Sequence, residues 1–389
     1  MFIPDRIAHF HRDMISWRHD IHAHPELAFR EHRTSDFVAT KLTAFGIPIH
    51  RGLAGTGIVG TLRCGSGDRA IALRADMDAL PIQEKTGAAH ASTHNGVMHA
   101  CGHDGHTTML LGAARYLTET RNFDGVVHFV FQPAEENECG GQVMVEAGLF
   151  THFPVDEVYG MHNWPGLPVG AFAVRSGPMM AADDKFEITL SSRGAHAAMP
   201  HLGDDPIVAV GTLIGAIQTI ASRIIDPQED IVVSVTEIHG GNTWNVIPEE
   251  VVLRGTCRYF NPELRPVLEA ALRQISGGVA ATHGVKVTLR HHKPIPPAVN
   301  AEEPTEKAAR AAALVVGEAN VHRNLPPSLG CEDFAFMLAE KPGCYIWIGN
   351  GPMEEGRTLH GARYDFKDEI LPIGASYWCA LVESVLPRR

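Results

Sequence analysis

The sequence lacks the features of membrane-spanning, secreted and nucleic-acid-binding proteins. No apolar run approaches the roughly 20 residues that span a bilayer. The first residues, "MFIPDRIAHFHRDM", include charges where a signal peptide is continuously apolar. Basic side chains are too few for a nucleic-acid partner, because 33 Lys and Arg stand against 45 Asp and Glu and the net charge is −12. We therefore expect a cytoplasmic protein that binds neither nucleic acid nor membranes.

Cysteine frameworks and nucleotide-binding loops are also missing. The seven cysteines are odd in number and widely scattered, which is a poor disulfide framework and fits a reducing compartment. No G-x-x-x-x-G-K-[ST] motif occurs, so a P-loop is excluded. No second paired Cys/His motif stands at zinc-finger spacing, and no repeat of about 20–50 residues is present.

The first half of the chain alternates strand-like and helix-like segments. A length of 389 residues allows about two domains of ~100–200 residues each. Strands alternating with helices predict an α/β fold, with a mainly parallel sheet and helices on both faces. In such sheets, ligands bind beyond the carboxyl ends of the strands. The expected strands cover residues 70–76, 125–133 and 156–164, and the expected helices cover 106–120 and 142–150.

The order of expected elements changes after about residue 183. Strand, helix, strand, strand, helix and strand follow one another at 185–192, 206–225, 230–241, 249–260, 262–284 and 285–295. This β-α-β-β-α-β order is ferredoxin-like. Helices at 304–317, 331–340 and about 368–386, with a strand at 344–349, then return to the first domain. The prediction is a catalytic domain of residues 1–183 and 299–389 with an inserted domain of residues 184–298.

Metal-capable side chains are concentrated in a few loops near strand ends. The segment "HACGHDGH" (99–106) holds three histidines, a cysteine and an aspartate just before an expected helix. The segments "RADMDALP" (74–81), "PAEE" (133–136) and "GMHNWP" (160–165) each follow an expected strand, and "LHGARYDF" (359–366) is a further candidate. Because α/β sheets bind ligands where their strands end, we expect these loops to face one another.

The residue types in these loops suit a transition-metal site with a separate base. Imidazole, thiolate and carboxylate groups together favour Zn, Mn, Co or Ni. Cys101 and His103 are two residues apart, so their side chains converge if that segment is extended. Glu135 and Glu136 are adjacent, so on an extended segment their side chains point in different directions. One can then bind a metal while the other reaches a bound water. Metal-assisted hydrolysis requires this division between ligand and base.

Simpler interpretations apply to each motif taken singly. A Cys-x-His pair arises by chance, and adjacent glutamates are more often a solvated surface pair. Cys101 could instead be a thiol nucleophile activated by His99 or His103. That chemistry leaves the glutamate pair and His162 unexplained, and a non-enzymatic metal-binding protein would have no use for a base.

The motifs taken together resemble a known family. In chain order they read "HPEL", "RADMDALP", "HACGHDGH", "QPAEE", "GMHNWP", "SSRGAHAAMPH", "NVIPEE", "GTCRYF", "GCEDFAF" and "LHGARYDFKDEIL". This series is similar to the aminoacylase/carboxypeptidase superfamily of metallohydrolases. The cysteine of "CGHDGH" resembles its amidohydrolase branch, which contains hippurate hydrolases, N-acyl-amino-acid amidohydrolases and auxin-conjugate hydrolases.

The resemblance implies two divalent transition-metal ions (Mn, Zn, Ni or Co) in each subunit. It implies Glu135 as the general base and Asp78 as a carboxylate that orients a metal ligand. Asp76 stands where other branches have a ligand histidine, and its contact with metal is left open. The implied metal ligands are Cys101, His103, Glu136, His162 and His360.

The resemblance also implies that the inserted domain is a lid and dimerisation domain in a homodimer or homotetramer. His196 would stabilise the oxyanion, reaching across from the partner subunit, while Asn245 and Arg258 would hold the substrate carboxylate. The implied reaction hydrolyses the amide bond of small N-acyl amino acids, such as hippurate, to a carboxylic acid and a free amino acid. A dipeptidase or carboxypeptidase activity is the alternative, and the acyl group is left open.

Overall fold

The computed structural model describes residues 2–136, 138–353 and 357–388, and the chain divides into two compact units. Unit 1 comprises Met1–Met179, Ala298–Pro326 and Asp333–Arg389, and unit 2 comprises Met180–Pro297 and Pro327–Glu332. The sequence had assigned 327–332 to the catalytic domain. These residues lie with unit 2 because the Ala181 N–H donates to the carbonyls of Ser328 and Gly330, at 3.0 and 2.9 Å. The role of unit 2 as a lid and dimerisation domain remains a prediction.

Unit 1 is built around an eight-stranded sheet in the order β1-β2-β4-β3-β5-β16-β6-β15. Its four central strands, β4, β3, β5 and β16, are parallel to their neighbours in that group, whereas β1, β2 and β4 pair antiparallel. Strands of unit 1 are β1 (Ile49–Leu53), β2 (Gly57–Cys64), β3 (Ala70–Asp76), β4 (Gly125–Gln132), β5 (Glu157–Trp164), β6 (Phe172–Val174), β7 (Gly177–Met180, which reaches unit 2), β14 (Ala298–Asn300), β15 (Val321–Arg323) and β16 (Gly343–Gly349). Helices are α1 (Asp5–His9), α2 (His11–Ala23), α3 (His32–Ala44), α4 (His103–Thr120), α5 (Gly140–Glu146), α6 (Leu149–His152), α9 (Glu302–Val316), η3 (Glu318–Asn320), α10 (Ala335–Glu340), η4 (Asp368–Ile370) and α11 (Leu371–Val385).

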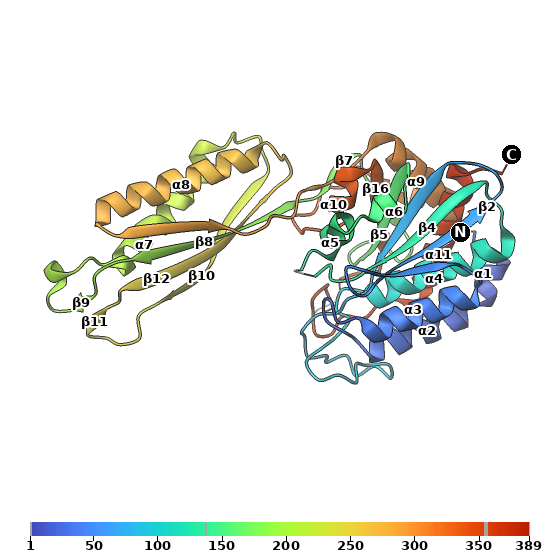
Figure 1. Ribbon diagram of the computed structural model, residues 1–389, viewed down its shortest axis with the longest axis horizontal. Helices are drawn as coiled ribbons and strands as arrows, with labels where there is room; N and C mark the ends of the chain where they lie inside the picture. The colour runs from blue at the N-terminus through green and yellow to red at the C-terminus, as the bar shows by residue number, and fades with distance from the viewer. Residues whose placement is uncertain (1, 137, 354–356, 389) are drawn as a thin grey trace. The chain divides into compact units, whose positions relative to one another are not determined.

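Helices cover both faces of this sheet, as Figure 1 shows. Every residue of β3 and β4 is buried, so these strands read as near-continuous apolar runs, as strands buried on both faces do. Ile71 and Leu73 belong to a core that also contains residues of α4 and α11. Arg74, one position along, lies with its guanidinium 5.7 Å from the centre of the Phe334 ring, beside α10. The predicted α/β fold with a largely parallel sheet is confirmed.

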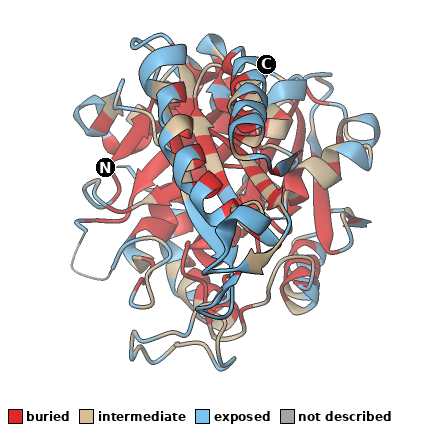
Figure 2. Cartoon of the chain, turned by 90° about the vertical axis from the view of Figure 1, so that its left-hand side faces the viewer, coloured by how far each residue is buried: buried red, intermediate tan, exposed pale blue. Residues whose placement is uncertain are grey.

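Unit 2 places two helices and four main strands around a smaller core. Its four-stranded antiparallel sheet has the order β10-β12-β8-β13. The elements are β8 (Ala182–Ser191), β9 (Ala195–His196), η1 (Pro200–Leu202), α7 (Pro206–Ile217), η2 (Ile220–Ile224), β10 (Ile231–Gly240), β11 (Val246–Ile247), β12 (Glu250–Tyr259), α8 (Leu264–His283) and β13 (Lys286–His291). Figure 2 shows extensive exposed surface on the elements nearest the viewer.

The expected long helix at 206–225 is interrupted after Ile217 and continues as the single π-helical turn η2. The sequence had predicted no apolar run of membrane-spanning length. Within the described residues, Pro206–Ile224 does reach the length and mean hydropathy of a membrane span, at 19 residues and 1.6. Core helices of soluble proteins also reach this length and mean hydropathy, so this stretch is weak evidence for a membrane segment. Its core-facing side chains are Ala209, Val210, Leu213, Ile217 and Ile220.

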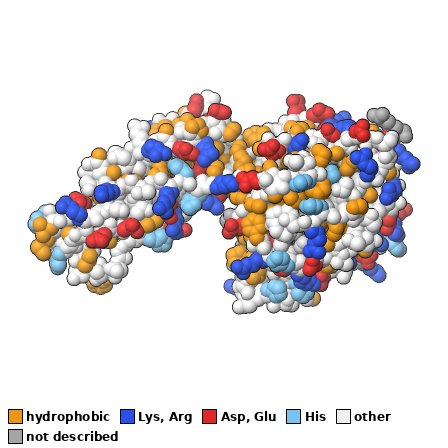
Figure 3. Space-filling model, in the orientation of Figure 1, with side chains coloured by type: hydrophobic (Ala, Val, Ile, Leu, Met, Phe, Trp, Pro, Cys, Tyr) orange, Lys and Arg blue, Asp and Glu red, His pale blue; other side chains and the backbone are white. Residues whose placement is uncertain are grey.

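Two other expected helices differ from the structure. The helix expected at 142–150 is two short helices, α5 and α6, separated near Gly148, whose φ is +89°. The helix expected at 331–340 is α10, which begins only at Ala335, and residues 331 and 332 of the expected helix belong to unit 2. Acidic and basic side chains are mixed over the face drawn in Figure 3, so the net charge of −12 is not gathered in one area of that face.

Candidate metal centre

The predicted site residues of unit 1 lie where neighbouring parallel strands end. β3 ends at Asp76, β4 ends at Gln132, three residues before Glu135, and His162 lies near the end of β5. β3 pairs in parallel with both β4 and β5, so these three ends meet at one edge of the sheet. α4 begins at His103 and brings the "HACGHDGH" segment to the same edge.

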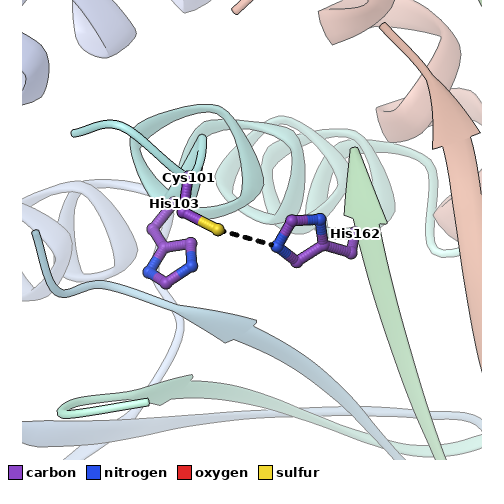
Figure 4. A group of neighbouring side chains, drawn as sticks. All are labelled: Cys101, His103 and His162. Atoms are coloured by element: carbon purple, nitrogen blue, oxygen red, sulfur yellow. Dashed lines mark hydrogen bonds between the residues drawn. The ribbon is translucent and has the colours of Figure 1, made fainter. Parts of the chain in front are cut away.

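Cys101, His103 and His162 form a buried cluster (Figure 4). The Cys101 Sγ and His162 Nε2 atoms are 3.3 Å apart. One ligand atom from each of the three residues lies within 4.8 Å of the other two. The structure therefore brings together three of the five predicted metal ligands, from two separate elements.

Glu136 and His360, the other two predicted ligands, extend this cluster. The Glu136 Oε1 and His360 Nε2 atoms are 3.1 Å apart. Together with the Cys101 thiol they form a second group, whose ligand atoms all lie within 4.8 Å of one another. Glu135 and Glu136 form a third such group with His103. Because the groups share members, all five predicted ligands and the predicted base occupy one continuous site. The local backbone is unusual, since His360 has a positive φ of 63°.

The two glycines of "HACGHDGH" are required by close packing. Gly102 has a φ of +95°, and a Cβ there would lie 2.3 Å from the Asn163 amide nitrogen. A Cβ on Gly105 would lie 2.3 Å from the Phe366 ring. Gly102 separates two predicted ligands, so its left-handed conformation sets the direction in which Cys101 and His103 point.

Asp78 holds two of the predicted ligands in place. Its Oδ1 lies 3.2 Å from His103 Nδ1, and its Oδ2 accepts a 2.9 Å hydrogen bond from the backbone N–H of Glu136. Since His103 uses Nδ1 for this contact, its Nε2 is directed at the cluster. That buried Nε2 atom has no hydrogen-bond partner among the described residues, and neither has Glu136 Oε1. Buried polar atoms without partners are costly, so these two atoms fit metal ligation.

Asp76 has a different set of partners. Its Oδ2 accepts a 2.7 Å hydrogen bond from Arg74, and its Oδ1 lies 2.6 Å from His106 Nδ1. His103 Nε2 is farther from Asp76, at 3.8 Å. The His106 Nε2 atom in turn accepts the backbone N–H of Asn163 at 2.9 Å. Asp76 and His106 therefore act mainly as a buried brace between β3, α4 and β5, a role that the sequence did not assign to His106.

The electrostatics of the cluster favour a bound cation. Burial, reinforced by the carboxylates of Glu136 and Glu135, raises the pKa of the Cys101 thiol well above its usual value. Burial opposes protonation of His103, but Asp76 and Asp78 raise its pKa to about 10. A thiol nucleophile requires a lowered pKa, so this surrounding argues against the thiol-enzyme alternative. A coordinated metal ion deprotonates a thiol outright.

The predicted substrate-binding residues of unit 2 lie at two separate places, one beside the two-stranded sheet of β9 and β11 and the other on the four-stranded sheet. His196 and Asn245 are neighbours, because β9 pairs with β11 and the Ala197 N–H donates to the Asn245 carbonyl at 2.9 Å. Arg258 instead lies 3.3 Å from Asp183, near the start of β8, whereas β9 follows the end of β8 at Ser191. At ~3.3 Å per residue, the stretch from 183 to 191 covers roughly 26 Å. One chain therefore does not bring Arg258 together with Asn245.

A parallel α/β sheet that gathers thiol, imidazole and carboxylate groups at its carboxyl edge, beside a second glutamate, has the construction of a metal-dependent hydrolase. Comparison with known proteins agrees. The model of Peptidase family M20/M25/M40 matches residues 72–384, and the chain belongs to this family. It is 40% identical over 364 residues to a hippurate hydrolase of Campylobacter jejuni, which covers 94% of each chain. It is 38% identical over 379 residues to an N-acetylcysteine deacetylase of Bacillus subtilis, covering 97% of this chain and 98% of the relative.

A solved structure has the same fold over the whole chain. The crystal structure of a Bacillus subtilis protein, described as a dinuclear metal-binding peptidase of the M20 family, aligns with a TM-score of 0.84 and 35% identity. The alignment covers 97% of this chain and 99% of that one. The predicted family and its amidohydrolase branch are confirmed, and so is the predicted class of enzyme, a metal-dependent hydrolase of amide bonds.

Proposed function

We propose that this protein hydrolyses N-acyl amino acids at a site for two divalent metal ions, releasing a carboxylic acid and a free amino acid. The observation that carries this proposal is the convergence of the predicted ligands and Glu135 in one site at the carboxyl edge of the sheet. The proposed ligands are Cys101, His103, Glu136, His162 and His360. The buried Nε2 of His103 and Oε1 of Glu136, each without a hydrogen-bond partner among the described residues, support this assignment.

Divalent ions held by these residues would supply Lewis-acid polarisation of the amide carbonyl and would lower the pKa of a bound water to about 7. Glu135 would accept the proton of the attacking water and later deliver it to the leaving amine nitrogen. It is suited to this because its carboxylate lies within 4.8 Å of ligand atoms of His103 and Glu136. Asp78 would keep His103 and Glu136 in position during the reaction.

The residues of unit 2 would bind the substrate. Arg258 would pair with the substrate carboxylate, for which a guanidinium offers bidentate hydrogen bonds. His196 would donate a hydrogen bond to the developing oxyanion. Because one chain places His196 and Asn245 beyond the end of β8 that is opposite to Arg258, we propose that they come from the partner subunit of a homodimer. The seven unpaired cysteines support a location in a reducing compartment such as the cytoplasm.

The test of the proposed base is Glu135→Gln. Loss of a general base typically costs about 10²–10⁴-fold in rate, so kcat should fall by that factor while the metal content, measured by elemental analysis, stays at the wild-type value. Glu138→Gln is the matched control, because Glu138 is exposed and lies three residues along the same segment. Near-normal turnover in Glu135→Gln would remove it as the base.

A peptidase activity is the second candidate, because the similar Bacillus subtilis structure is described as a peptidase. A dipeptide carries a free amino group where an N-acyl amino acid carries none. Comparing kcat/KM for N-benzoylglycine, N-acetylcysteine and a matched series of dipeptides on metal-reconstituted protein separates the two. The names of the two relatives make benzoyl and acetyl the first acyl groups to test. Preference for dipeptides would replace the proposed substrate class.

A further inference from the structure

A second group of metal-capable side chains lies within unit 2. Alternation along β8 places Asp184 on the same face as Ala182, Phe186 and Ile188, which belong to the core of unit 2. Likewise His291 follows the same face of β13 as Leu289, which packs against that core. Asp184 and His291 are thus polar residues on the core-facing sides of β8 and β13, at the same end of the sheet.

α8, which runs along this sheet (Figure 1), adds a third side chain. Ligand atoms of Asp184, Glu269 and His291 all lie within 4.8 Å of one another. The Asp184 Oδ1 and His291 Nδ1 atoms are 3.9 Å apart. Zinc binds histidine nitrogen and carboxylate oxygen at about 2.0–2.2 Å, so two ligand atoms on one ion lie roughly 3.4 Å apart. Small side-chain rotations bring the three groups to that spacing.

The atoms that face this group are unsatisfied. The Asp184 side chain is only 5% exposed, and its buried Oδ1 atom has no hydrogen-bond partner among the described residues. The same holds for both ring nitrogens of His291. Burial raises the pKa of Asp184, although Arg265, His291 and a hydrogen bond with Tyr259 oppose this. A buried carboxylate requires compensation by a cation, a proton or hydrogen-bond donors, and Asp184 Oδ1 has no such donor among the described residues.

Arg265 supplies only part of that compensation. Its Nε lies 3.5 Å from Asp184 Oδ2 and 3.1 Å from Glu269 Oε1, but the same Nε atom makes no hydrogen bond to any described residue. The Arg265 side chain is 42% exposed. It can turn into solvent when an ion enters, without losing a buried hydrogen bond.

We propose that Asp184, Glu269 and His291 bind one divalent transition-metal ion of the zinc class, separate from the ions of the catalytic site. One imidazole and two carboxylates match the preference of such ions for nitrogen and oxygen ligands. The ion would join β8, β13 and α8. This site stabilises unit 2 and takes no part in the hydrolytic step.

The experiment uses the full-length protein, stripped with a chelator and titrated with Zn²⁺ alone. Bound zinc per chain is counted by elemental analysis, and amide hydrogen exchange is followed in β13 and α8. The wild type should bind one more equivalent than His291→Ala, and zinc should slow exchange in both elements in the wild type but not in His291→Ala. Loss of a ligand should lower the affinity for this additional zinc ion on the order of tenfold or more.

Two further variants make the result decisive. His292→Ala is the matched control, because His292 is the exposed neighbour on the opposite face of the strand end, and it should bind the wild-type number of ions. Glu269→Gln, on the surface of α8, removes a ligand without opening the core and should also lose one equivalent. Equal stoichiometry in all four proteins, or zinc-independent exchange in β13 and α8 of the wild type, would overturn the proposal and leave an ion-pair cluster around Arg265.

Discussion

Replacing Asp104 with Asn removes the carboxylate that accompanies two buried cations of unit 1. Asp104 is wholly buried one residue after His103, and its Oδ2 lies 2.8 Å from His22 Nδ1 and 3.1 Å from Arg18 Nη1. Removing one partner of a buried ion pair typically costs about 3–5 kcal/mol, because the remaining charge is left uncompensated. Asp104→Asn keeps the shape and removes the charge.

The pH dependence of this loss follows from His22. Burial alone would lower the pKa of His22, but Asp104 and Glu84 raise it to about 9, from about 6.5 in an unfolded chain. The charged imidazole therefore stabilises the fold fully below about pH 6.5, and this stabilisation is lost as the pH rises through 9. A shift of this size is worth about 3 kcal/mol. The destabilisation by Asp104→Asn should accordingly be about 3 kcal/mol larger at pH 6 than at pH 9.5.

The assay is urea unfolding of chelated protein, followed by tryptophan fluorescence at both pH values. Tryptophan emission reports mainly on unit 1, since the one tryptophan of unit 2, Trp244, is fully exposed and changes little on unfolding. Asp13→Asn is the control, because its ion pair with Arg115 lies at the surface, where the Asp13 side chain is 56% exposed. Surface pairs are worth ~0–1 kcal/mol. An equal loss of stability at pH 6 and pH 9.5 in Asp104→Asn would refute the assigned pairing of His22.

Three further predictions concern the metal centre and the partner subunit. Cys101→Ser should lower the metal content per chain; unchanged stoichiometry by elemental analysis would count against ligation. Gly102→Ala should lower both metal affinity and thermal stability more than Gly87→Ala, because both have positive φ, which costs ~1–2 kcal/mol, but only Gly102 has a neighbour within 4 Å of the new Cβ. His196→Ala should cripple hydrolysis at normal metal content, and mixing it with Glu135→Gln subunits should partly restore activity; the absence of rescue would indicate a site built within one chain.

The parallel core of unit 1 could be predicted because its strands are buried on both faces. Such strands are continuous apolar runs with a strong local signal, as in β3 and β4. The antiparallel edge could not be predicted in this way. β1 exposes most of its residues and contains Gly52, so its strand character depends on pairing with β2. The return of 327–332 to unit 2 rests on backbone hydrogen bonds to Ala181, far away in sequence, and has no local pattern.

The metal centre was predictable to the extent that its ligands are dense in sequence. Cys101 and His103 stand two residues apart, and the glutamate pair directly follows a buried strand. His360 is distant in the chain and was assigned only through the resemblance to a family. The group in unit 2 was missed because Asp184 and His291 each stand between other charged or polar residues at the ends of strands, so neither is conspicuous in the sequence; the signal that could have found them is their place in a core-facing alternation.

The buried carboxylates of unit 1 separate into two kinds, and the difference indicates where a metal ion belongs. Asp104 and Asp76 each form ion pairs with arginine and histidine side chains of the protein, which compensate their negative charge. Glu136 Oε1 instead lies 3.1 Å from His360 Nε2, whose side chain is 54% exposed, and both residues belong to the proposed ligand cluster. A buried carboxylate charge is strongly disfavoured without a cation beside it. Asp104 and Asp76 are therefore paired with side chains of the protein itself, whereas the position of Glu136 beside Cys101 and His360 fits the proposed binding of a metal ion.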